Sequence, residues 1–204
     1  MVRFSEYMNQ WLYGYQGYYA SMPTIGKEGD FYTSVSTSMF FGGAIGKHLV
    51  DIIDEGFLSP HATVIEIGAH RGYLLADLIQ FVYTLRPELL QSLSFVIVEP
   101  LQKAREAQAA YFQAAFGDVI GITQLETLDG FTCKEAYIVA NELFDAFPCE
   151  IIHEGKMLYM DGNDASFQPL DEATANIATR YNITRGEVGV GYECFASSLS
   201  AACE

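Results

Sequence analysis

Apolar and polar residues alternate along the middle of the chain in a way that predicts strands and helices in turn. Short apolar runs predict strands at 63–67, 94–98, 118–122 and 136–140. Apolar residues recur at helical spacing over the intervening segments 73–84 and 101–115. Strands that alternate with helices form parallel sheets with right-handed crossovers. The pattern therefore predicts an α/β fold, with a parallel sheet and helices on both of its faces.

The segments before this core have another pattern. The opening segment is rich in tyrosine, and Ser5 is expected to cap a helix that carries Trp11 and Leu12 on one face. A second helix is expected over 36–56, with Gly56 at its C-cap. The opening of the chain is thus expected to add a helical, aromatic region to the core.

The pattern changes again after the last core strand. Two short runs joined by Glu154 and Gly155 predict a hairpin near 149–160. A helix, a strand and a second helix are then expected at 171–180, 187–192 and 194–203. We therefore expect two domains, an N-terminal helical region over 1–60 and an α/β domain over 61–204 that carries the hairpin as an insertion.

The strongest chemical signal lies where the first core strand ends, in the sequence EIGAHRG that starts at Glu66. A dinucleotide fingerprint needs G-x-G-x-x-G, but His70 and Tyr73 occupy its second and third glycine positions. A P-loop is excluded because no Gly-Lys-Ser/Thr is present. The pattern E-x-G-x-G-x-G, usual in methyltransferases, fits at Glu66, Gly68 and Gly72, with His70 in place of the middle glycine.

The next core strand ends in Glu99, which is placed to hold a ribose diol. S-adenosylmethionine carries an ammonium, a carboxylate, a sulfonium and a ribose. It suits a site with acids at the strand ends and backbone N–H groups at a helix start. The two strand ends therefore predict a site for S-adenosyl-L-methionine. For the turn alone, a tight strand-to-helix connection without a ligand is the alternative.

A second group of polar residues follows the strand at 136–140. Asn141, Glu142 and Asp145 come at its carboxyl end, at the same edge as the cofactor turn. If the turn is helical, Glu142 and Asp145 share a face and can grip a guanidinium by bidentate hydrogen bonds. They could then align a guanidinium nitrogen with the sulfonium methyl. The alternative is that Asn141 and Asp145 only satisfy backbone groups of a loop.

A third polar group, in the segment Gly29–Ser34, lies ahead of the core. Asp30, Thr33 and Ser34 could line a polar pocket beside the cofactor. The alternative is a turn that caps the following helix.

Composition narrows the class of protein and of partner. With 204 residues, 50% of them hydrophobic and 18% charged, the chain can bury one sizeable core and is not disordered. The net charge of −15 argues against nucleic acid and suits a basic substrate. Scattered histidines and four cysteines without C-x-x-C spacing predict free, buried thiols and no metal site. No apolar run is long enough to span a membrane and no secretory signal opens the chain, so a cytoplasmic protein is expected.

These motifs in this order resemble the MidA-type family of S-adenosylmethionine-dependent methyltransferases, relatives of the mitochondrial complex I assembly arginine methyltransferase. The resemblance covers most of the chain. It is carried by the aromatic opening and by the four segments 29–34, 66–74, 97–100 and 140–148.

The resemblance implies a Rossmann-like class I methyltransferase core and S-adenosyl-L-methionine as methyl donor. It suggests methylation of arginine in a protein substrate, linked to a respiratory complex I subunit; a homodimer is one expected assembly. The residues that match the family's cofactor motifs, or that would face the cofactor, are Glu66, Gly68, His70, Gly72, Glu99 and Thr33. Those that would face the reaction space are Glu142, Asp145, Asn141 and Asp30.

The chain also departs from the family pattern. His70 stands where the family has glycine, and Val35-Ser36 stands where it has Pro-Glu. Family members are substantially longer, so their C-terminal core strands are expected to be missing here. A non-catalytic cofactor-binding or assembly protein of the same fold is therefore the alternative to an enzyme.

Overall fold

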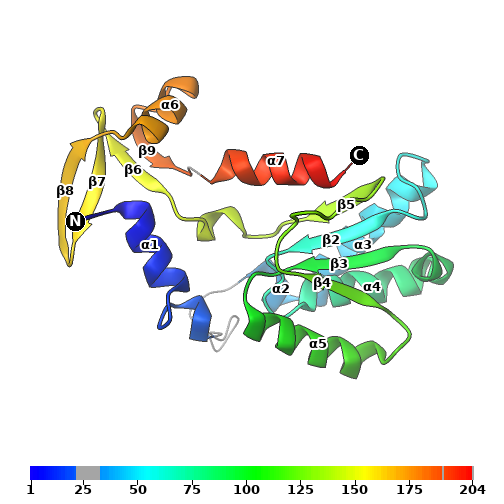
Figure 1. The fold of residues 1–204 in the computed structure, drawn as a ribbon. Coiled ribbons are helices and arrows are strands. Elements are labelled where there is room, and N and C mark those ends of the chain that lie inside the picture. Colours follow the sequence, from blue (N-terminus) through cyan, green and yellow to red (C-terminus); the bar gives the residue numbers. More distant parts are fainter. Residues whose placement is uncertain (22–32, 190, 204) are drawn as a thin grey trace. The chain divides into compact units, whose positions relative to one another are not determined.

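The computed structural model describes residues 1–21, 33–189 and 191–203 (Figure 1). The chain divides into two compact units. The first unit comprises Met1–Ser21 and Phe144–Ser197, and the second comprises Met22–Leu143 and Ser198–Glu204. These units do not coincide with a division at residue 60, because the chain before residue 60 contributes to both.

The second unit is built on a sheet of four parallel strands. These are β2 (Thr63–Ile67), β3 (Ser94–Val98), β4 (Ile122–Leu125) and β5 (Ala136–Val139). Their order is β4-β3-β2-β5, which puts the two strands that carry the cofactor motifs side by side at the centre. The predicted α/β fold with a parallel sheet is thereby confirmed.

This unit also contains helices α2 (Ser34–Thr37), α3 (Met39–Asp54), α4 (Tyr73–Leu85) and α5 (Gln102–Phe116), the short 3-10 helix η2 (Pro87–Gln91) and the end of α7 (Tyr192–Ala202). The apolar faces of α3 and α4 are buried with β2 and β3 in one core, in which Leu49, Leu78 and Ile97 have no exposed surface. Glycines on α3 allow close packing, because a Cβ at Gly43 would lie 2.5 Å from the ring of Phe81.

The first unit contains an antiparallel sheet that runs β1-β7-β6-β9, with β8 also paired to β7. Its strands are β1 (Val2–Arg3), β6 (Glu150–His153), β7 (Lys156–Asp161), β8 (Asp164–Pro169) and β9 (Arg185–Val188). Its helices are α1 (Phe4–Tyr13), η1 (Tyr19–Ser21), η3 (Phe144–Ala146), α6 (Glu172–Arg180) and the start of α7 (Tyr192–Ala202). The predicted hairpin is confirmed as β6 and β7, joined by Glu154 and Gly155 in left-handed conformations.

Three predictions for the opening of the chain need correction. Ser5 does not cap α1; it lies inside the helix, and its hydroxyl donates to the fully buried carboxylate of Glu150. Trp11 is 67% exposed and is not on a buried face. The helix expected over 36–56 is interrupted at Ser38, whose side chain caps α3 by accepting from the Phe40 amide.

Later predictions differ from the structure in position or are incomplete. The strand expected at 118–122 is instead β4, which begins at Ile122. The strand expected at 187–192 is β9, which ends at Val188. Strands β1 and β8 were not predicted.

Two expectations from composition can be compared with the structure. Within 1–21, 33–189 and 191–203, no helix is long and apolar enough to cross a membrane. The four cysteines are free thiols, but only Cys149 is buried.

Candidate functional site

The turn between β2 and α4 has a backbone path that depends on its glycines. Gly68 and Gly72 have φ values of 71° and 79°, in the left-handed region that favours glycine. A Cβ at Gly68 would lie 2.7 Å from Leu143 Cδ1, and a Cβ at Gly72 would lie 2.7 Å from Phe112 Cε2. Both positions therefore favour glycine, as the motif predicts.

His70, at the middle position of the motif, also has a left-handed backbone with φ 48°. A residue with a side chain rarely adopts this conformation. The backbone of this chain thus follows a path natural to glycine although the residue is histidine. With histidine in place of the motif's glycine, the turn therefore keeps a backbone conformation that glycine could also adopt.

Glu66, at the end of β2, points into the protein. Its Oε2 accepts a hydrogen bond from the Leu75 amide at 3.1 Å, so the carboxyl group ties the strand to the first turn of α4. Burial raises the pKa of Glu66 from its ordinary value of 4.5 to about 8. Its observed contact is with the protein backbone, and its predicted contact with a cofactor stays a prediction.

The raised pKa of Glu66 has a consequence for stability. Between the ordinary pKa and the raised value of about 8, the native state holds a proton that the unfolded state has released. The contribution of Glu66 is therefore fully present at low pH and is lost as pH rises through this window. We expect Glu66→Gln, which keeps an oxygen for the Leu75 amide, to reduce this loss. Urea unfolding from about pH 5 to 8 would measure it, and parallel curves for the two proteins would contradict the assignment.

Glu99, at the end of β3, is fixed by the turn that it faces. Its Oε2 accepts from the His70 amide at 3.2 Å, and its Oε1 accepts from the Leu101 amide at 3.1 Å. Burial raises the pKa of this carboxyl, while the two backbone donors oppose the rise. The Glu99 carboxylate is thus held in one place beside the glycine turn, with acceptor capacity left for hydroxyl groups.

Sheet register brings these groups together. Ile67 pairs with Val98, so the carboxyl ends of β2 and β3 lie next to each other. The Gly68 amide donates to the Val98 carbonyl at 2.9 Å and continues the ladder into the turn. A small ligand with a diol and a charged end can lie at such an edge, as in other doubly wound folds.

The residues after β5 lie at the same edge of the sheet, because β5 pairs in parallel with β2. Glu142 is exposed, has a left-handed backbone with φ 49°, and accepts from the Ser34 amide at 3.3 Å through Oε1. Asn141 precedes it and is half-buried. The structure therefore connects Glu142 with the segment that begins at Thr33.

The remaining predictions for the site concern Thr33, the pair Glu142 and Asp145, and Asp30, and the structure tests only part of them. Thr33 caps α2, because its hydroxyl accepts from the Ser36 amide at 3.1 Å, which agrees with the capping alternative. The condition under which Glu142 and Asp145 would share a helical face is not met, since Glu142 has a left-handed backbone and η3 begins at Phe144. Asp145 belongs to the first unit, and Asp30 lies outside the described residues.

One buried polar group near the turn was not predicted. Gln108 on α5 has no exposed surface, and its amide nitrogen donates to the His70 carbonyl at 2.9 Å. The sequence does contain an indication of it. Ala104, Gln108 and Phe112 are spaced four residues apart on the buried face of α5, and Gln108 is the one polar residue among these three.

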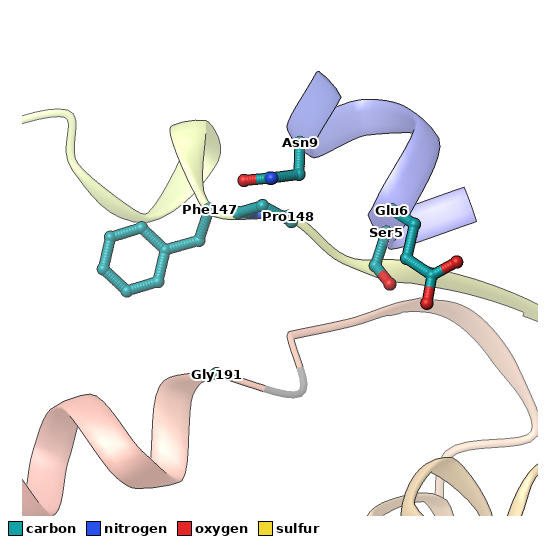
Figure 2. A pocket seen from close by; sticks show the side chains of 6 residues that line it. All are labelled: Ser5, Glu6, Asn9, Phe147, Pro148 and Gly191. Carbon is teal, nitrogen blue, oxygen red and sulfur yellow. The ribbon is translucent and has the colours of Figure 1, made fainter. Parts of the chain in front are cut away.

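The first unit has a hollow of its own (Figure 2). It has a volume of about 280 Å³ and is lined by Ser5, Glu6, Asn9, Phe147, Pro148 and Gly191. The Ser5 hydroxyl already donates to Glu150, and Glu6 already pairs with Arg3 at 2.8 Å. The hollow therefore offers a charged ligand little that is not used within the protein, and no predicted site residue lines it.

Comparisons with protein families, curated proteins and solved structures all find methyltransferases or a protein bound to S-adenosyl-homocysteine. The profile of the family described as "Putative S-adenosyl-L-methionine-dependent methyltransferase" matches residues 44–189. The mitochondrial protein arginine methyltransferase NDUFAF7 of Mus musculus is 33% identical over 111 residues, which are 53% of this chain and 25% of that protein. Its Drosophila melanogaster homolog is 31% identical over 179 residues, 78% of this chain and 39% of that protein. The chain thus spans less than half the length of these relatives.

A solved structure has the same fold. It is a Burkholderia thailandensis protein bound to S-adenosyl-homocysteine, with a TM-score of 0.79 and 23% sequence identity. The match covers 99% of this chain and 55% of that one.

Proposed function

Since the chain belongs to this family of S-adenosyl-L-methionine-dependent methyltransferases, we propose that it binds the cofactor at the edge of β2 and β3 and takes part in methyl transfer. The observation that carries the proposal is the hydrogen bond from the His70 amide to Glu99 Oε2 at 3.2 Å. It joins the glycine turn of one strand to the acid of the next. These are the two features that the cofactor needs, a close backbone approach and an acceptor for its ribose.

The residues present fit the cofactor. Gly68 and Gly72 hold the turn in the left-handed conformation that glycine favours, and Glu99 keeps its carboxylate at the strand end beside that turn. When bound, S-adenosyl-L-methionine supplies an electrophilic methyl group on its sulfonium. Gly68 and Gly72 would lie along it, and Glu99 would accept hydrogen bonds from its ribose hydroxyls.

We propose arginine in a protein as the methyl acceptor. The mouse and fruit fly relatives are protein arginine methyltransferases, and the net charge of −15 favours approach of a basic substrate. Glu142 is exposed and lies after β5, beside the cofactor strand β2. Its carboxylate would orient a guanidinium and accept the proton that a guanidinium nitrogen loses when it becomes methylated. Asn141, Asp145 and Asp30 stay predictions for this role.

Titration calorimetry and a transfer assay would test the proposal. We expect saturable binding of S-adenosyl-homocysteine, and transfer of label from S-adenosyl-L-methionine to an arginine-rich protein. Glu142→Gln should lower the transfer rate at least about tenfold and leave the Kd for S-adenosyl-homocysteine unchanged. Glu55→Gln, at the exposed C-cap of α3, is the matched control and should change neither.

The outcomes separate the candidate functions. Binding without transfer to any basic protein would favour the alternative, a non-catalytic protein that uses the cofactor site for assembly. That alternative is favoured by His70, which stands at a glycine position of the motif. No binding by folded protein would contradict the proposal. A complex I subunit as the substrate, a homodimer and a cytoplasmic location stay predictions.

A further inference from the structure

Gln108 is an unusual residue for its position in the second unit. It lies on α5 between Ala104 and Phe112, one helical turn from each, and its side chain has no exposed surface. Burying an amide costs free energy unless both of its ends find partners. Its position therefore raises the question of what the amide group binds.

Both ends of the Gln108 amide have partners that fix its orientation. Nε2 donates to the His70 carbonyl at 2.9 Å, and Oε1 accepts from Gln124 Nε2 at 2.9 Å. Gln124 Nε2 also donates to the carbonyl of Arg105 at 2.9 Å. If the oxygen and nitrogen of the Gln108 amide exchanged places, the oxygen would face the His70 carbonyl and the nitrogen would face the Gln124 nitrogen. Both hydrogen bonds would be lost, so only the observed orientation makes them.

These bonds are part of a closed ring around the two strand ends. Arg105 Nη1 donates to the Glu99 carbonyl at 2.6 Å, and Glu99 Oε2 in turn accepts from the His70 amide at 3.2 Å. The peptide groups on both sides of His70 are therefore held, the amide by Glu99 and the carbonyl by Gln108. The ring links α5 and β4 to the glycine turn and to the end of β3.

The conformation of His70 explains why such a restraint is needed. At φ 48°, a residue with a side chain is strained, whereas glycine is not. Hydrogen bonds on both sides of the residue can offset this strain. We propose that Gln108, oriented by Gln124, is a positioning residue that holds His70 in the conformation required for cofactor binding. This inference rests on the proposed function.

A double-mutant cycle tests the inference. Gln108→Leu keeps the approximate size of the side chain and removes both hydrogen bonds. We expect it to raise the Kd for S-adenosyl-homocysteine about tenfold, the amount that corresponds to one lost hydrogen bond. It should also speed hydrogen exchange at the amides of Ala69–Gly72 in cofactor-free protein. The kcat at saturating cofactor should stay within about threefold, because the residue touches no reacting atom.

The second arm of the cycle uses His70→Gly. Glycine needs no restraint to adopt a left-handed backbone, so Gln108→Leu should cost much less affinity in this background than in the wild-type protein. Gln113→Leu, on an exposed face of the same helix, is the matched control and should leave the Kd unchanged. Thermal unfolding of each variant checks that it is folded.

Each outcome has a definite meaning. If the wild-type protein binds and Gln108→Leu binds equally well, the inference is wrong and the proposed function stands. If the loss of affinity is the same with glycine and with histidine at position 70, Gln108 does not act through His70. If folded wild-type protein fails to bind S-adenosyl-homocysteine, the proposed function fails and the inference falls with it. If Gln108→Leu does not fold, Gln124→Leu replaces it in the cycle, since Gln124 fixes the orientation of the Gln108 amide.

Discussion

Glu99→Ala should weaken binding of S-adenosyl-homocysteine about 100-fold, the largest effect on affinity that we expect from a single substitution. The carboxylate accepts from the amides of His70 and Leu101, and it is the proposed acceptor for the ribose hydroxyls. Hydrogen bonds to charged groups contribute roughly 1.5–3 kcal/mol each, and about 1.4 kcal/mol is a tenfold change in Kd. Loss of the ribose contact and of the support for the turn together gives the expected factor. Titration calorimetry on the two proteins would measure it.

A matched variant shows whether the effect belongs to the site. Glu106→Ala removes an exposed carboxylate on α5, which accepts a hydrogen bond from the Gln102 side chain. It should bind S-adenosyl-homocysteine like the wild-type protein. A Glu99→Ala variant that is folded and keeps its affinity within about threefold of wild type would show that the cofactor is bound elsewhere.

The centre of the second unit could be predicted from the sequence because its strands are buried on both faces. Every residue of β2 is buried, and apolar residues make up most of this strand and of β3. β4 could not be placed in this way, because its residues are exposed or half-buried and two of its four residues are polar. Val119 was included in the predicted strand because it is apolar, but it is 85% exposed. The hydrophobic pattern therefore located β2, β3 and β5 and misplaced β4.

Errors near the start of the chain have another physical origin. Ser5 is a good N-cap residue by local rules, but it binds Glu150, which is 145 residues away in the sequence. A buried carboxylate needs hydrogen-bond donors, and Ser5 supplies them to Glu150 on a strand that is distant in the sequence. The residues next to Ser5 in the sequence give no indication of this partner. The same limit applies to Gln108, whose partner His70 lies 38 residues away.

In the candidate site, too, some residues are placed by their neighbours in the sequence and others by contacts that are distant in the sequence. The glycine turn and Glu99 could be predicted because their spacing along the chain reports the local strand–turn–helix geometry. The shared helical face of Glu142 and Asp145 could not be judged from the sequence, because it required a helical turn. The left-handed backbone at Glu142, which its residue type does not favour, excludes that turn. Sequence thus identified the groups that a motif fixes, whereas those fixed by packing required the structure.

Gly72→Ala should destabilise the protein by about 2–5 kcal/mol, because two penalties act together at this position. A non-glycine residue in the left-handed conformation costs roughly 1–2 kcal/mol, and overpacking a core costs roughly 1–3 kcal/mol. At Gly72, φ is 79° and the added Cβ would lie 2.7 Å from Phe112 Cε2. Phe112 is only 5% exposed and packs against Phe116, so its ring has little room to move away. Urea unfolding would measure the loss.

Gly56→Ala separates the two penalties, because Gly56 has nearly the same backbone, φ 77°, with nothing within 4 Å of an added Cβ. The free energy of unfolding of Gly56→Ala should fall only by the cost of a left-handed backbone in a non-glycine residue, about 1–2 kcal/mol. Phe112→Leu provides a second comparison, since a smaller side chain facing Gly72 should reduce the additional cost of Gly72→Ala. Equal losses for Gly72→Ala and Gly56→Ala would show that the ring of Phe112 gives way freely. In that case, close packing of α5 against the turn would not be what requires glycine at position 72.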